Sequence, residues 1–317
     1  MVDAFGRTID YLRVSVTELC NLRCLYCMPP DGVVKRCHAE MMTEEELLRA
    51  VRAAADLGIK KVRITGGEPL VKKNILSIAA GIANTPGIEE VCLTTNGVLL
   101  PQMAEALVRA GVRRVNISLD TLDAQKYAFI TRGGKLADAL AGLDAALAAG
   151  FSRVKLNAVL IGGFNDDEIG KLAALTRTRD LDVRFIELMP LYDGGDFTDD
   201  AFLSCDTVLE RLPELVPEAP DGGVARLFRL PGAAGRIGLI RPLSAHFCGT
   251  CNRLRLTADG KIKPCLHAPE EYSLRGMDSA GMQRVLLTAL RNKPACHPPL
   301  SAQERSRAMR NMNEIGG

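Results

Sequence analysis

The feature that most constrains this 317-residue chain is a repeated alternation of short β-branched runs with longer helical patterns. The runs carry apolar residues on both faces, which is typical of parallel strands covered by helices. One helix is marked by a capping box, with Thr43 as N-cap and Glu46 three residues on, and by Gly58 as a stop signal. Further helices are expected to start near Lys73, Pro101, Lys135 and Asp166. The strand-like runs are residues 11–17, 61–66, 90–97, 113–120, 153–160 and 182–189.

Six strand–helix units predict an α/β fold: an incomplete (βα)6 TIM-like barrel of parallel strands, two units short of the closed eightfold barrel. An unclosed barrel has a lateral opening through which something large could enter. The rhythm stops near Pro190, and only short strand-like runs follow. We therefore predict a partial barrel over residues 1–190 and a C-terminal extension over residues 191–317 that closes the lateral opening.

Composition excludes several classes of function. The net charge is only +2, Trp is absent and aromatic residues make up 4% of the chain. These values argue against a bulk basic surface or base-stacking platforms for nucleic acid. No run of about 18 apolar residues predicts a membrane span. The first residues show no signal-peptide pattern, so we expect a cytoplasmic protein whose ten cysteines serve metal or redox chemistry.

Three of those cysteines lie within eight residues, in the sequence CNLRCLYC (20–27). Thiolates are soft ligands that suit zinc or iron–sulfur clusters. A [4Fe–4S] cluster held by three cysteines keeps one iron open for a small molecule. The alternative is a zinc site completed by a distant ligand such as His38. The first triad, as we call this set, is Cys20, Cys24 and Cys27.

A second set with metal-binding spacing lies near the C-terminus, and we call Cys248, Cys251 and Cys265 the second triad. It again offers three thiols, so it predicts either a second open cluster or a zinc ribbon closed by His246 or His267. Arg253 and Arg255 follow at alternating positions of an expected strand, so they should point to the same side. Paired guanidinium groups suit phosphate, although two solvated arginines remain the alternative.

The motif TGGEP (65–69) follows the second expected strand, where glycines allow a backbone to approach a ligand. Together with the first triad and Tyr26, it resembles the radical S-adenosylmethionine (SAM) superfamily. The resemblance implies that the first triad holds a [4Fe–4S] cluster that binds SAM and cleaves it reductively to a 5′-deoxyadenosyl radical. The SAM-binding positions that it implies are Tyr26, Gly67, Glu68, Ser118 and Met189.

Segments spread over nearly the whole chain are similar to the GTP 3′,8-cyclase family of molybdenum cofactor biosynthesis. They include LRVSVT, LTTNG, VNISLD, VKLNAV, RFIELMP, GRIGLI and the terminal GG. The resemblance implies that the second triad holds a second [4Fe–4S] cluster, which anchors the substrate guanine. Three of the implied GTP contacts lie within expected strands, where structural ion pairs are the alternative: Arg13, Arg63 and Lys155. The other implied contacts are Thr94, Arg253 and Arg255.

The same resemblance implies the reaction. Hydrogen abstraction at C3′ of GTP leads to a C3′–C8 bond and to 3′,8-cyclo-7,8-dihydro-GTP. A free, flexible tail that ends in Gly316 and Gly317 would reach into the active site, whereas composition alone predicts a disordered end. Implied partners are a reductant protein and, by product transfer, cyclic pyranopterin monophosphate synthase. A homodimer is compatible with the family.

Three alternatives stay open at this level. One is a radical SAM enzyme that modifies a peptide, the second is an iron–sulfur electron carrier, and the third is a zinc-stabilised binding module. TELCN, which contains Glu18, and LYDGGDF (191–197) depart from the family pattern, and the second of these could affect how the tail docks. Structural or incidental roles are expected for Cys37, Cys92, Cys205 and Cys296.

Overall fold

The computed structural model describes residues 1–33, 36–191, 201–301 and 304–316. It has an α/β fold built on a mostly parallel twelve-stranded sheet. The six strands predicted from sequence are confirmed, and they pair in parallel in chain order. Their bounds are β1 (Tyr11–Ser15), β2 (Lys61–Thr65), β3 (Glu90–Thr95), β4 (Val112–Ser118), β5 (Arg153–Leu160) and β6 (Leu181–Glu187).

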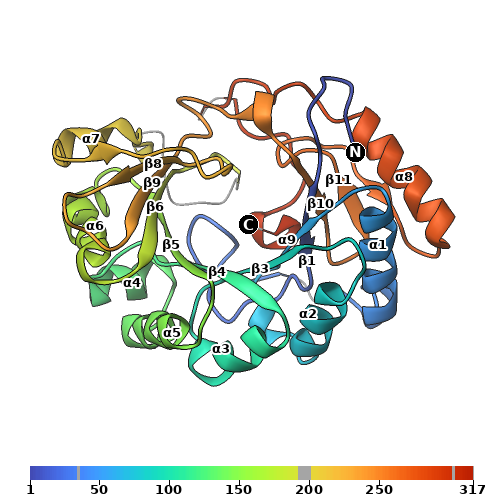
Figure 1. The fold of residues 1–317 in the computed structure, drawn as a ribbon, viewed down its shortest axis with the longest axis horizontal. Helices are drawn as coiled ribbons and strands as arrows, with labels where there is room; N and C mark the ends of the chain where they lie inside the picture. The colour runs from blue at the N-terminus through green and yellow to red at the C-terminus, as the bar shows by residue number, and fades with distance from the viewer. Residues whose placement is uncertain (34–35, 192–200, 302–303, 317) are drawn as a thin grey trace.

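The predicted helices are also present and lie on the outside of the curved sheet (Figure 1). Both hydrogen bonds of the Thr43–Glu46 capping box form at the start of α1. A short helix after β4, capped by Asp123, was not expected from sequence. The helices up to β6 are α1 (Glu44–Asp56), α2 (Ile75–Ala83), α3 (Leu100–Arg109), α4 (Ala124–Ile130), α5 (Leu136–Ala148) and α6 (Ile169–Thr178). Single 3₁₀ turns are η1 (His38–Glu40), η2 (Pro69–Val71) and η3 (Asp166–Glu168).

The short strands beyond residue 191 extend the same sheet at both of its edges, which the sequence did not predict. At one edge β9 (Arg236–Ile240) pairs in parallel with β6, and at the other β10 (Arg253–Leu256) pairs in parallel with β1. Antiparallel strands finish both edges: β7 (Val216–Pro217), β8 (Arg226–Arg229), β11 (Lys261–Lys263) and β12 (Tyr272–Ser273). The remaining helices are α7 (Asp206–Arg211), η5 (Cys248–Thr250), α8 (Ser279–Arg291) and α9 (Met312–Ile315).

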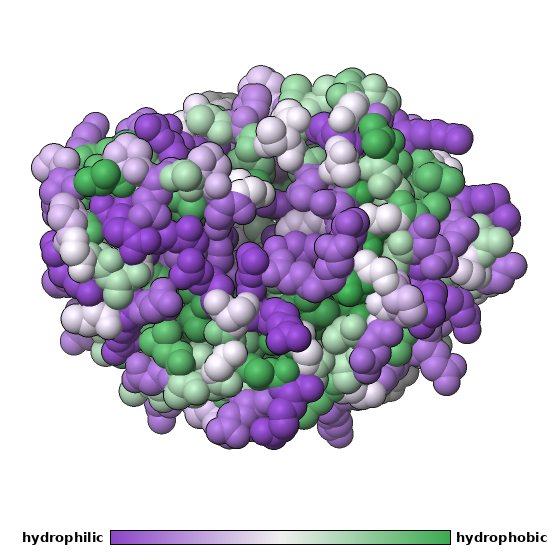
Figure 2. Space-filling model, viewed as in Figure 1, coloured by the Kyte–Doolittle hydropathy of each residue, from purple (hydrophilic) through white to green (hydrophobic). Residues whose placement is uncertain are grey.

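The sheet curls around a central space, and the main hydrophobic core fills the layer between its outer face and the helices. α8 packs against α1. α9 lies near the centre of the curved sheet (Figure 1). The space-filling view is hollowed at this centre, and hydrophilic residues gather at the rim (Figure 2). None of the helices within the described ranges has the length and apolar character needed to cross a membrane.

Two helical glycines give a matched test of the packing between helix and sheet. A Cβ on Gly142 in α5 would overlap the carbonyl oxygen of Gly97, whereas a Cβ on Gly170 in α6 would meet no heavy atom within 4 Å. We expect Gly142→Ala to lower the free energy of unfolding by about 1–3 kcal/mol. Gly170→Ala should leave it unchanged or raise it by about 0.5 kcal/mol. Urea unfolding measures both, and a fully stable Gly142→Ala variant would contradict this packing.

Candidate active site

A cavity of about 420 Å³ lies on the inner side of the sheet, and both cysteine triads line it. All six cysteines are free thiols and are half-buried. β10 follows Cys251 and pairs in parallel with β1, which precedes Cys20, so the two triads face the same cavity from opposite ends of this strand pair. The cavity lining does not include the four cysteines without metal spacing, of which Cys92 and Cys205 are buried and Cys37 and Cys296 exposed.

The loop that carries the first triad is fixed by backbone contacts with α4. The amides of Arg23 and Leu25 donate to the carbonyls of Thr131 and Ile130, at 3.1 and 2.9 Å. Burial raises the pKa of the Cys27 thiol to about 12. Burial and the neighbouring Cys27 likewise raise the pKa of Cys24 well above its ordinary value. Such thiols lose their protons when a metal centre binds, because the positive charge of the metal stabilises the thiolates.

The second triad begins in η5 and is held from the opposite end of the chain. The guanidinium of Arg7 donates to the carbonyls of Cys248 at 2.8 Å and Ala295 at 2.9 Å. His246 and His267, the ligands of the alternative zinc ribbon, also line the cavity, and His267 is hydrogen-bonded to Ser306 at 3.0 Å. Among the described residues, no three His, Cys, Asp or Glu side chains converge as ligands of a single metal ion. The His38 side chain, considered as a ligand above, lies outside what is described.

All five positions that the resemblance implied for SAM line the cavity, namely Tyr26, Gly67, Glu68, Ser118 and Met189. Gly67 sits so close to the loop of the first triad that a Cβ would overlap the Leu19 carbonyl oxygen. The hydroxyl of Tyr26 donates to Asp120 at 2.7 Å, and the other oxygen of Asp120 accepts from the amide of Val159 at 2.8 Å. Burial raises the pKa of Asp120 to about 6.

Glu68 also reaches the cavity wall, but its carboxylate is already bonded within the chain. It accepts hydrogen bonds from the amide of Leu70 at 3.0 Å, the hydroxyl of Thr95 at 2.7 Å and the amide of Asn96 at 2.7 Å. Burial raises its pKa to about 7. The Glu68 side chain thus fastens the loop after β2 to the loop after β3. Glu187 does the same at the end of β6, where it accepts from the amide of Ser244 at 3.0 Å.

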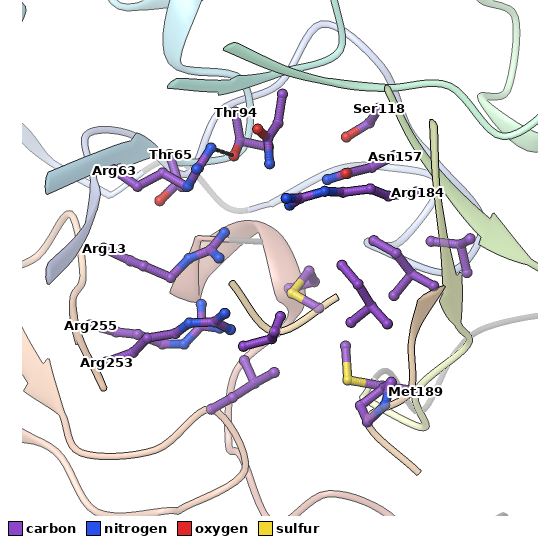
Figure 3. Close-up of a pocket in the computed structure, with 18 of the residues that line it drawn as sticks. Arg13, Arg63, Thr65, Thr94, Ser118, Asn157, Arg184, Met189, Arg253 and Arg255 are labelled. Atoms are coloured by element: carbon purple, nitrogen blue, oxygen red, sulfur yellow. Dashed lines mark hydrogen bonds between the residues drawn. The ribbon is translucent and has the colours of Figure 1, made fainter. Parts of the chain in front are cut away.

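Arginines from adjacent strands form a row on the cavity wall. The parallel register sets Arg13 on β1 opposite Arg63 on β2 and Arg255 on β10, and Figure 3 shows these side chains pointing into the cavity together with Arg253. Burial, and then repulsion from Arg255, lowers the pKa of Arg13 well below its ordinary value. Burial and Arg253 lower that of Arg255 to about 10. Clustered cations of this kind are stabilised when an anion enters among them.

The alternative of a structural ion pair, raised above for strand residues, holds for Lys155 but not for Arg63. The ammonium of Lys155 lies 3.2 Å from Asp182 and 3.6 Å from Asp221. Burial and Arg184 nevertheless lower its pKa to about 8. Arg63 instead donates to the hydroxyl of Tyr11 and, at 3.3 Å, to the hydroxyl of Thr94. No carboxylate of the described residues lies within 4.0 Å of the Arg63 guanidinium.

Sequence reasoning missed several polar groups that reach into the cavity opposite the arginine row. Arg184 on β6 points toward that row from the other side (Figure 3). The Nε atoms of Arg184 and Arg253 and the Oδ1 atoms of Asn116 and Asn157 are buried without hydrogen-bond partners in the described structure. Buried polar atoms normally have partners, so these atoms indicate a polar ligand. Asn116 and Asn157 stand inside VNISLD and VKLNAV, so the strand-end motifs did contain this signal.

The C-terminal tail enters the cavity but is packed there, whereas we had expected a free, flexible end. Gly316 is buried and its carbonyl accepts from Arg255, which also donates to the Ile315 carbonyl at 3.4 Å. A Cβ on Gly316 would overlap the hydroxyl of Thr65, and its φ of 72° favours glycine. Gly317 lies outside the described residues.

The tail is fastened just before α9 by an ion-pair cluster. Arg310 donates to both oxygens of Asp259, at 3.1 and 2.8 Å, and to both oxygens of Glu271, at 2.7 Å each. Arg36 bridges Glu18, at 3.1 Å, and Glu314, at 3.4 Å. The TELCN segment, which departs from the family pattern, thus supplies a carboxylate that helps to fasten the tail.

These features define a class of protein: residues 14–176 match the Radical SAM superfamily, and residues 181–298 match Molybdenum Cofactor Synthesis C. Two curated relatives, both named GTP 3′,8-cyclase, cover all of this chain over their full length. The relative from Alkaliphilus oremlandii is 47% identical, and the one from Alkaliphilus metalliredigens is 48% identical. The chain therefore belongs to the GTP 3′,8-cyclase family of the radical SAM superfamily.

Solved structures share the fold at low sequence identity. Streptococcus suis SuiB bound to S-adenosylmethionine matches with a TM-score of 0.65 and 15% identity, over 91% of this chain and 67% of that chain. Methylornithine synthase (PylB) matches with a TM-score of 0.53 and 17% identity, over 66% of this chain and 63% of that chain. These likenesses concern the fold alone.

The tail contacts predict a local effect of Arg310. Replacing it by Gln leaves Asp259 and Glu271 without their main partner, which should cost about 3 kcal/mol. We expect amides of residues 311–316 to exchange hydrogen at least about tenfold faster in Arg310→Gln. Hydrogen-exchange mass spectrometry measures this, and Arg307→Gln, at an exposed position three residues before, is the matched control. Equal protection in Arg310→Gln and wild type would show that the cluster does not hold the tail.

Proposed function

We propose that this chain is a radical SAM GTP 3′,8-cyclase, the enzyme that opens molybdenum cofactor biosynthesis. The observation that carries the proposal is the meeting of two three-cysteine sets and a row of buried arginines in one cavity. Curated relatives with this name are 42–48% identical over essentially their whole length, which supports the same assignment. SAM and two [4Fe–4S] clusters are the cofactors that the family requires.

The first triad would hold the cluster that binds SAM. Its three half-buried thiols are free and face the cavity, which fits a cluster with one open iron. When bound, the cluster and SAM supply the electron and the 5′-deoxyadenosyl radical that removes hydrogen from the substrate. Tyr26, Gly67, Ser118 and Met189 would border SAM. Glu68 would act chiefly by positioning, since its oxygens already accept hydrogen bonds from three donors of the chain.

The arginine row would bind the triphosphate of GTP. Arg13, Arg63, Arg253 and Arg255 present guanidinium groups to the cavity, and such groups bind phosphate oxygens in pairs. The cations whose pKa burial lowers would regain stability beside an anionic ligand. Thr94 borders this site through its hydrogen bond with Arg63. Lys155 would join it from the edge, by sharing an ammonium that now contacts Asp182 and Asp221.

The second triad would hold the cluster whose open iron anchors the guanine. Its thiols are free and line the wall next to Arg253 and Arg255, so one ligand could meet both groups. This arrangement would fix C3′ of the ribose and C8 of the base relative to the SAM site. Residues of the chain thus bind and orient the substrate so that C3′ and C8 can join after hydrogen abstraction. The product would be 3′,8-cyclo-7,8-dihydro-GTP.

The tail would border the substrate through Gly316 and Gly317. The hydrogen bonds between Arg255 and the backbone of residues 315 and 316 support this role, since they join the tail to the arginine row. In this proposal residues 1–190 form a partial TIM-like barrel that carries the SAM chemistry. Residues 191–317 close its lateral opening and supply the second cluster and the tail.

The wider setting follows from the proposed chemistry. Open-iron clusters and free thiols suit the reducing cytoplasm, which is where we propose that the enzyme works. A reductant protein would deliver the electron, and the product would pass to cyclic pyranopterin monophosphate synthase. A homodimer is compatible with this proposal. No role for nucleic acid or membrane enters it.

One anaerobic experiment tests the proposed function. After reconstitution with iron and sulfide, we expect about eight irons per chain, four for each triad. With SAM and dithionite, 5′-deoxyadenosine should form only when GTP is added, and deuterium should move from GTP labelled at C3′ into it. Zinc in place of iron would favour the binding module. Iron without SAM cleavage would favour an electron carrier, and 5′-deoxyadenosine formed equally without GTP would favour another radical SAM substrate.

The proposed phosphate site has its own test. Each lost charge-assisted hydrogen bond costs about 1.5–3 kcal/mol, so Arg253→Gln should raise the Kd for GTP by about 10–100-fold. Binding of guanosine, which has no phosphates, should change little. Arg109→Gln, at an exposed arginine on α3, is the control for loss of one positive charge. Anaerobic equilibrium dialysis measures both ligands, and an equal loss for guanosine would place Arg253 away from the phosphates.

A further inference from the structure

Lys293, which follows the end of α8, carries a buried charge that the proposed function does not use. Only 3% of the residue is exposed. Its ammonium donates to the carbonyl of Arg253 at 2.8 Å, to the carbonyl of Pro264 at 2.7 Å and to the sulfur of Cys251 at 3.6 Å. An ammonium has three N–H donors, so these three acceptors satisfy its hydrogen bonds completely.

Hydrogen bonds do not neutralise the charge, and no carboxylate of the described residues lies within 4.0 Å of this ammonium. Lys263 makes the contrast clear. It is also fully buried, but its ammonium lies 3.1 Å from Glu271. An uncompensated buried charge is costly, because burial removes it from water. The nearest groups that could carry a compensating negative charge are the thiols of the second triad.

The contacts of the second triad support its pairing with the charge of Lys293. Among the described side chains, Lys293 is the cation that donates a hydrogen bond to a sulfur of this triad, that of Cys251. The direct contacts of the two neighbouring arginines are made to other groups: the guanidinium of Arg253 lies over the rings of Tyr11 and Phe247, and that of Arg255 donates to the tail carbonyls.

We propose that Lys293 is the counter-charge of the second triad and sets the reduction potential of the cluster that this triad holds. Three thiolates give such a cluster a net negative charge, which one-electron reduction increases. A fixed positive charge at hydrogen-bond distance from Cys251 stabilises the reduced form more than the oxidised form, so it raises the potential. Lys293 is thus a positioning and tuning residue, and it does not contact the reacting atoms of the substrate.

The inference rests on the proposed function to the extent that the second triad must hold an iron–sulfur cluster. The test uses the full chain, reconstituted anaerobically and titrated with dithionite while reduction is followed by electron paramagnetic resonance. A Cys20→Ala/Cys24→Ala/Cys27→Ala background identifies which signal belongs to the second triad. The variants are Lys293→Met, which removes charge and donors, and Lys293→Arg, which keeps both.

Lys293→Met should make reduction of the second cluster at least about tenfold less favourable, which corresponds to a shift of about 59 mV to more negative potential. Lys293→Arg should keep a potential close to that of wild type. Lys263→Met is the matched control, because it removes a buried lysine whose charge is already paired with Glu271. Its potential should also stay close to the wild-type value.

Iron content separates the remaining outcomes. Loss of iron from the second triad in Lys293→Met, with retention in Lys293→Arg and Lys263→Met, would support the counter-charge. A fully loaded Lys293→Met with the wild-type potential would overturn it, as would an equal shift or equal iron loss in Lys263→Met. If the wild-type second triad binds no iron, the proposed function itself fails. A loaded wild type with no effect of Lys293 defeats this inference alone.

Discussion

Parallel pairing of β10 with β1 is the contact on which the rest of this structure depends. It sets residues 253–256 in register with residues 11–14, although some 240 positions separate them in the chain. The first triad follows β1 and the second triad begins before β10, so this strand pair places the two triads at opposite ends of the same cavity. The matching pairing of β9 with β6 extends the other edge of the parallel array in the same way. The C-terminal region is therefore part of the sheet that builds the site.

The cavity is lined by several buried cations, whose charges would be strongly destabilised in a hydrophobic core. Arginines on neighbouring strands face one another across a single register row, and burial lowers the pKa of Arg13 and Arg255. Carboxylates at strand ends do not neutralise this row, because Glu68, Asp120 and Glu187 are bonded to amides and hydroxyls of neighbouring loops. These three carboxylates thus hold loops, while the guanidinium groups of the row face the cavity. An anionic ligand completes such a site.

The C-terminal segment joins the two halves of the site. Arg310 fixes it against Asp259 and Glu271. The side-chain amide of Asn313 in α9 then donates to the carbonyl of Glu18, just before the first triad, at 3.1 Å, and Gly316 lies beside Arg255. One short segment is therefore in contact with the loop of the first triad and with the proposed phosphate site. The glycine at 316 is required by local geometry, since a side chain there would overlap Thr65. A displacement of residues at either site would therefore change the contacts of the tail.

The sequence by itself determined the six parallel strands, the capping box of α1, the two cysteine sets and the family, because periodicity, capping and spacing are local properties of the chain. Only the tertiary structure decided which charges are paired: Lys155 has two carboxylate partners and Arg63 has Tyr11, although both stand in similar strands. The same holds for the packed tail, for Arg184 and for Lys293, whose surroundings come from distant segments. Contacts between residues far apart in the chain depend on strand register and sheet curvature, which no local pattern encodes.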